Sequence, residues 1–117
     1  MKPNWRSLLF VPAASPQRWE KAHTRGADAI ILDLEDSTQP EAKAEARKPA
    51  SDAVNALAAN GAQVTVRVNN DPEHLEQDLE AVVVPGLIAI VLPKVEEAQE
   101  LAALSTMLEA IEYERGM

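Results

Sequence analysis

Three carboxylates close an apolar run early in the chain, where they could supply the acidic groups of an enzyme site. Residues 29–36 read Ala-Ile-Ile-Leu-Asp-Leu-Glu-Asp. The branched apolar residues predict a strand buried on both faces, and strand alternation places Asp33 and Glu35 on one face. Asp36 stands where the strand should give way to a loop. The C-terminal tip of a buried parallel strand is the usual place for an α/β active site. Glu35 and Asp36 are therefore catalytic candidates, and the alternative is a cluster of solvated loop acids.

Cationic and amide side chains follow two later strands. Residues 63–69 read Gln-Val-Thr-Val-Arg-Val-Asn, so Arg67 and Asn69 share a face opposite the valines. An arginine inside a valine-rich strand is costly unless it is paired. Arg67 therefore either meets Glu35 or Asp36, or binds the carboxylate or phosphate of a ligand in a bidentate manner. Lys94 follows the apolar run 87–92 and is either an exposed lysine or a partner for the acids.

Four strands alternate with helices, which predicts a parallel sheet with right-handed crossovers and a single α/β domain over residues 1–117. The strands are expected at 7–11, 29–36, 63–69 and 87–92. Ser15-Pro16 is typical of a helix start, and that helix should run to about Arg25 before Gly26. The helical region 41–59 should break near Lys48 because Pro49 follows. Further helices are expected from Asp71-Pro72 to Val83, and from about Glu96 with Leu101, Leu104, Leu108 and Ile111 on its apolar face.

Composition limits the function classes. The net charge of -8 argues against a nucleic-acid backbone and against an anionic membrane surface as partners. The absence of cysteine excludes disulfides, thiolate catalysis and Cys-ligated zinc, and it fits a cytoplasmic location. The longest apolar runs are far shorter than a membrane span. At 117 residues the chain is also short for a closed α/β barrel, which typically needs about 250.

Five ordered motifs together resemble the citrate lyase beta-subunit-like group of the HpcH/HpaI aldolase family. They cover nearly the whole chain: 6–13 (Arg-Ser-Leu-Leu-Phe-Val-Pro-Ala), 26–36 (Gly-Ala-Asp-Ala-Ile-Ile-Leu-Asp-Leu-Glu-Asp), 43–47 (Lys-Ala-Glu-Ala-Arg), 66–69 (Val-Arg-Val-Asn) and 91–95 (Val-Leu-Pro-Lys-Val). The resemblance implies that the chain is the first four βα units of a TIM (β/α)8 barrel. A phospho-acceptor receiver domain fits poorly, because it would need acids after the first strand and an acceptor Asp after the third.

The resemblance also implies an activity and residue roles. The family makes or breaks carbon–carbon bonds in citryl-, malyl- or citramalyl-type thioesters of CoA or an acyl carrier through an enolate, with Mg2+ holding the oxoacid or enolate oxygens. Arg67 matches its substrate-binding arginine. Glu35 and Asp36 match an acidic pair near the metal, expected to act through water or by orienting other groups. Asn69 and Lys94 are the further substrate-binding candidates at the barrel mouth.

The direct metal ligands of the family lie beyond the motifs matched here. They are a Glu in an Ile-Glu-Thr motif after strand five and an Asp after strand six, whereas this sequence ends at Met117. The expectation is an N-terminal half-barrel truncated before strand five, with no first-shell metal ligand and no activity of its own. The alternative function is a non-catalytic assembly or binding subunit that pairs with itself or with a partner half.

Overall fold

The strands form one parallel sheet in the order β1-β2-β3-β4. The computed structural model describes residues 4–117. Its strands are β1 (Leu8–Pro12), β2 (Ala29–Asp33), β3 (Val64–Arg67) and β4 (Leu87–Val91). Asp33, the last residue of β2, is in register with Pro12 of β1 and with Arg67 of β3. The C-terminal ends of neighbouring strands are therefore level with one another, which brings the residues that follow them to one edge of the sheet.

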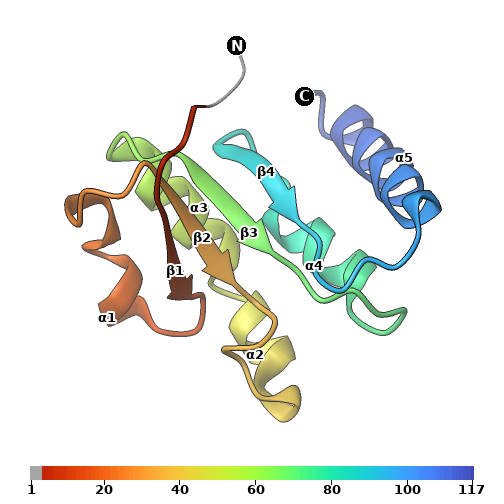
Figure 1. The fold of residues 1–117 in the computed structure, drawn as a ribbon, viewed down its shortest axis with the longest axis horizontal. Helices are drawn as coiled ribbons and strands as arrows, with labels where there is room; N and C mark the ends of the chain where they lie inside the picture. The colour runs from red at the N-terminus through yellow and green to blue at the C-terminus, as the bar shows by residue number, and fades with distance from the viewer. Residues whose placement is uncertain (1–3) are drawn as a thin grey trace.

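Helices follow each strand, as the sequence predicts. They are α1 (Pro16–Trp19), the 3-10 helices η1 (Ala22–Thr24) and η2 (Pro40–Ala42), α2 (Lys43–Arg47), α3 (Ala50–Ala59), α4 (Leu75–Val82) and α5 (Ala98–Glu114). In Figure 1, α3 and α4 lie behind the sheet, while α2 lies below the strand tips. The predicted break before Pro49 is confirmed, since α2 ends at Arg47 and α3 begins at Ala50.

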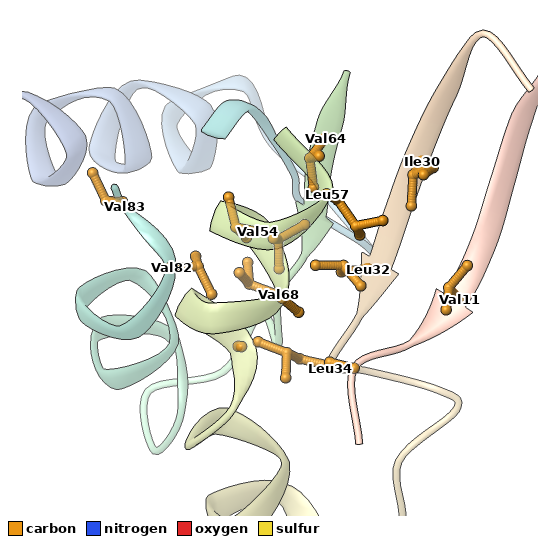
Figure 2. Packing of buried hydrophobic residues seen from close by; sticks show 14 of the residues in the cluster. Val11, Ile30, Leu32, Leu34, Val54, Leu57, Val64, Val68, Val82 and Val83 are labelled. Carbon is orange, nitrogen blue, oxygen red and sulfur yellow. The ribbon is translucent and has the colours of Figure 1, made fainter. Parts of the chain in front are cut away.

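An aliphatic core lies between the sheet and these helices. Figure 2 shows Val54 and Leu57 of α3 beside Leu32 of β2 and Val64 of β3. Every residue of β2 is buried, which confirms the prediction of a strand buried on both faces. With only 3% aromatic residues, the core depends on the close packing of Val, Leu, Ile and Ala side chains.

The sheet face opposite α3 and α4 carries no helix within residues 4–117 (Figure 1). On the edge strand β1, Leu8 and Phe10 point away from the core and are half exposed. Ile88 on the other edge strand, β4, is exposed to a similar degree. Apolar side chains at this exposure are typical of a surface that contacts another segment or chain.

Two helix predictions need correction. The single helix expected over 16–25 is wrong, because the segment divides into α1 and η1 before Gly26 turns at a φ of 84°. Ser15 gives no side-chain cap and α1 buries no residue, so little stabilises a longer helix there. On α5, Leu104 and Ile111 are buried as expected, but Leu101 is half exposed.

Candidate functional site at the strand ends

Asp33 and Arg67 form a bidentate ion pair across β2 and β3. The Nε of Arg67 lies 2.9 Å from Oδ1 of Asp33, and Nη2 lies 2.9 Å from Oδ2. Asp33 is buried and the Arg67 side chain is about one-fifth exposed. The sequence left open whether Arg67 meets Glu35 or Asp36 or binds a ligand. In the structure its main partner is instead Asp33, and Glu35 lies farther away at 3.6 Å.

The Asp33 carboxylate also accepts hydrogen bonds from the backbone of the turn that contains Glu35 and Asp36. Oδ1 of Asp33 accepts the backbone N–H of Glu35 at 3.0 Å, and Oδ2 accepts that of Ser37 at 3.0 Å. Burial alone would raise the pKa of Asp33. The hydrogen bonds from Arg67, Glu35 and Ser37 outweigh that effect and lower the pKa to about 2. The Asp33 carboxylate in turn raises the pKa of Arg67, so both groups are charged at neutral pH.

Glu35 links this pair to Lys94. The Nζ of Lys94 lies 2.6 Å from Oε2 of Glu35 and 3.7 Å from Oδ1 of Asp36. Of the two alternatives that the sequence allowed, Lys94 is thus a partner for the acids, and Glu35 raises its pKa. Lys94 also adopts a left-handed backbone conformation with a φ of 55°, which a non-glycine residue adopts at some cost. The buried Oε1 of Glu35 accepts no hydrogen bond.

Asn69 is buried and its side-chain amide is fully engaged inside the chain. Its Nδ2 donates to the Leu34 carbonyl at 3.0 Å and to Oδ2 of Asp78 at 2.7 Å. Its Oδ1 accepts from Nζ of Lys43 at 2.6 Å, and Lys43 also donates to the Glu35 carbonyl at 2.9 Å. These contacts give Asn69 a supporting position under the Glu35 turn, and both N–H groups of its side-chain amide are already used within the chain.

A polar hollow of about 510 Å3 lies beside these residues. Glu35, Asp36, Asn69 and Lys94 line it, so four of the five predicted site residues meet there. Arg67 is not among its lining residues and adjoins it through Glu35. The other lining residues come from the loops after β2 and β3, from η2 and from α2: Thr38, Gln39, Pro40, Lys43, Asn70 and Asp71.

The strand-end acids fit contacts near a Mg2+ ion rather than a complete set of ligands. Mg2+ prefers carboxylate and water oxygens in octahedral geometry. Asp33 is saturated by its four hydrogen bonds, whereas Glu35 keeps one oxygen without a hydrogen bond and Asp36 is exposed. Within residues 4–117, the three ligand atoms that lie close together belong instead to Asp71, Glu73 and His74.

Two residues of this site were not singled out from the sequence. The sequence pattern puts Asp33 on the face of Glu35 without pairing it with Arg67, and it gives Lys43 only as part of the motif 43–47. The signal for Asp33 is that it and Arg67 both end apolar strands, with side chains on the same face. Pairing them requires the register of β2 against β3, which the sequence pattern does not specify.

The family profile that describes HpcH/HpaI aldolase/citrate lyase matches residues 6–117. The chain belongs to the HpcH/HpaI aldolase/citrate lyase family. This confirms the family that the five motifs indicate. The predicted fold class, parallel βα units of a (β/α)8 barrel, is confirmed as well, since solved structures of that fold cover the chain.

Curated relatives resemble this chain over most of its length. The citrate lyase subunit beta of Leuconostoc mesenteroides subsp. cremoris is 33% identical over 95% of the chain. The L-malyl-CoA/beta-methylmalyl-CoA lyase of Cereibacter sphaeroides is 35% identical over 98% of it. In both cases the chain spans about 37% of the length of the relative.

Two solved structures extend the comparison. The citrate lyase beta subunit of M. tuberculosis, complexed with oxaloacetate and magnesium, has a TM-score of 0.59 and 34% identity, covering 84% of this chain and 42% of that one. The malate synthase of Haloferax volcanii has a TM-score of 0.84 at 18% identity over 100% of this chain and 39% of its own, a likeness of fold alone. Among residues 4–117, no helix combines the length and apolar character needed to cross a membrane.

Proposed function

We propose that this chain forms the N-terminal half of the active site of a Mg2+-dependent carbon–carbon lyase that acts on citryl-, malyl- or citramalyl-type CoA thioesters. The observation that carries the proposal is a row of alternating charges at the C-terminal ends of three strands. This charge row consists of Arg67 at the end of β3, Glu35 after β2 and Lys94 after β4. Family membership supports it, and so do the CoA thioester lyases among the relatives. The cytoplasmic location stays a prediction.

Arg67 is the proposed substrate contact. A guanidinium has five N–H donors, and Asp33 takes two of them, so three stay available to a carboxylate or to an oxygen that gains negative charge. The oxoacid part of the substrate, of which oxaloacetate is an example, would supply such an oxygen. Because the pKa of Arg67 is raised, its positive charge is present throughout the working pH range.

Glu35, Asp36 and Lys94 form the proposed second part of the site. Lys94 neutralises Glu35, and its exposed ammonium keeps N–H donors at the edge of the hollow for an oxygen of an anionic substrate. Glu35 and Asp36 would contact the surroundings of Mg2+ through water. When bound, the ion would supply positive charge beside the oxygen on which negative charge develops. Asn69 contributes by supporting the Glu35 turn rather than by touching the substrate.

The reaction that this site would serve is an aldol- or Claisen-type cleavage. The substrate hydroxyl loses its proton, the adjacent carbon–carbon bond breaks, and its electron pair moves onto the thioester as an enolate. The enolate then takes up a proton to give the shorter thioester, and the former hydroxyl carbon becomes the carbonyl of the second product. Charge moves toward oxygen during bond cleavage, so a fixed guanidinium stabilises the transition state more than the ground state.

The substitution Arg67→Lys tests this role when it is made in the protein in the form that its source produces. Lysine keeps the charge but loses the planar bidentate geometry, so kcat/KM for L-malyl-CoA should fall about 100-fold. The matched control is Arg6→Lys, which changes an exposed arginine that pairs with Asp28 at the opposite end of β2. The control should keep the wild-type rate. An unchanged rate in the Arg67→Lys variant would contradict the assignment.

A second candidate function is assembly with another copy or with a partner half. The observation that favours it is the half-exposed apolar side chains of Leu8, Phe10 and Ile88 on the edge strands of the sheet. Sedimentation velocity over a range of protein concentrations measures this directly. Self-assembly predicts a sedimentation coefficient that rises with concentration, and a constant monomer value would argue against pairing with itself.

A further inference from the structure

We propose that Asp33 is the positioning residue of the site: it orients the Arg67 guanidinium toward the substrate and ties it to the turn that carries Glu35. This inference rests on the proposed function, in which Arg67 binds the oxoacid. It assigns a role to a buried carboxylate that does not itself reach the substrate.

The hydrogen bonds of Asp33 leave its carboxylate no free capacity. Each oxygen accepts one N–H from Arg67 and one backbone N–H, from Glu35 at Oδ1 and from Ser37 at Oδ2. Four charge-assisted bonds of 2.9–3.0 Å hold a residue that is only 2% exposed. Asp33 is therefore suited to fix geometry and unsuited to contact a ligand or a metal ion.

These bonds determine which edge of Arg67 stays available. Asp33 occupies Nε and one N–H of Nη2, so both N–H groups of Nη1 and the second of Nη2 remain. One face of the guanidinium lies over the Phe10 ring, with Cζ 4.6 Å from the ring centroid. An arginine held along one edge by Asp33 and on one face by Phe10 keeps few orientations, so little freedom is lost when a substrate binds.

Asp33 also couples the two halves of the charge row. The carboxylate that holds Arg67 holds the backbone of Glu35, and Glu35 contacts Lys94. Removing the Asp33 charge should therefore release Arg67 and loosen the Glu35 turn together. A displacement of about 1 Å at such groups is enough to weaken catalysis strongly.

The test combines a spectroscopic and a binding measurement on Asp33→Asn. The Arg67 Nε–H signal in a 15N-labelled sample, assigned by its loss in Arg67→Lys, should exchange with water about tenfold faster or more in Asp33→Asn. The dissociation constant for oxaloacetate in Mg2+, measured by calorimetry, should rise about tenfold. Asp28→Asn is the matched control, because Asp28 also accepts two backbone N–H groups and an arginine, but at the other end of β2. The control should change neither quantity.

The outcomes separate this inference from the proposed function. If the wild-type protein binds no oxaloacetate in Mg2+, the proposed substrate role of Arg67 fails and the inference that rests on it fails too. If the protein binds oxaloacetate, and folded Asp33→Asn keeps slow Nε–H exchange and wild-type affinity, the positioning role alone is overturned.

If Asp33→Asn does not fold, Asp33→Glu replaces it as the test variant. Glutamate keeps the charge but moves it by one methylene, so oxaloacetate should bind about tenfold more weakly, and wild-type affinity would overturn the proposal.

Discussion

At the residue scale, the candidate site consists of two buried carboxylates, Asp33 and Glu35, each paired with a cationic side chain that is more exposed. Asp33 and Arg67 neutralise each other, and Glu35 is neutralised by Lys94. Isolated charges at the tips of buried strands would be costly, whereas hydrogen-bonded pairs are tolerated and well oriented. Three guanidinium N–H groups and the exposed Lys94 ammonium can still donate to an anionic ligand, as the proposed function requires.

Asp33 should make the unfolding free energy of the protein depend on pH below about pH 4. Its pKa is lowered from 3.8 to about 2 in the folded chain, so its contribution to stability is complete above about pH 4 and is lost as the pH falls toward 2. A shift of this size corresponds to about 2 kcal/mol. Urea unfolding between pH 4 and pH 2 should therefore show a smaller loss of unfolding free energy for Asp33→Asn than for the wild type. Asp52→Asn, which changes an exposed carboxylate on α3, should follow the wild type. Equal losses in all three proteins would contradict the value for Asp33.

At the element scale, the loops after β2 and β3 are fixed to α2 and α4 by a buried network. Asp78 of α4 accepts Nε of Arg47 from α2 at 2.8 Å, and it accepts the backbone and side-chain N–H of Asn69 at 2.9 and 2.7 Å. Lys43 of α2 completes the network at Asn69. The acids are therefore carried on loops that two helices hold in place through buried hydrogen bonds.

Loss of the Asp78 charge should destabilise the protein strongly. Asp78→Asn leaves Arg47, whose side chain is only 13% exposed, without its carboxylate partner, and breaking a buried ion pair costs about 3 kcal/mol. Glu76→Gln on the same helix changes an exposed carboxylate and should shift the unfolding free energy by less than about 0.5 kcal/mol. Chemical denaturation measures both variants. Equal unfolding free energies for Asp78→Asn and Glu76→Gln would show that the buried network around Asp78 contributes little to stability.

The sequence predicts the elements better than it predicts their contacts. The apolar run at 29–32, the alternating valines at 64 and 66, and Pro49 mark two strands and a helix break through local chemistry alone. The division of 16–25 into two short helices depends on which residues become buried, and burial is a property of the whole fold. The partnership of Arg67 with Asp33 depends on strand register in the same way. Hence the location of the site could be inferred from strand ends, whereas its internal pairing required the structure.

At the scale of the whole molecule, the chain is a sheet with one face covered by α3 and α4 and with apolar side chains on its edge strands. It spans about 37% of the length of its curated relatives. The charge row lies at one end of this sheet, where the strand tips meet, and a barrel fold places its catalytic groups at that end. This position agrees with the proposal that the chain forms the N-terminal half of an active site.

The most direct test of the proposed function is the cleavage of L-malyl-CoA, citramalyl-CoA and citryl-CoA by the protein from its source, with Mg2+ present, removed by a chelator, and restored. We predict that at least one of these thioesters is cleaved with Mg2+, that chelation abolishes cleavage, and that added Mg2+ restores it. A folded protein that cleaves none of the three with Mg2+ would contradict the assignment as a lyase and would favour the assembly role.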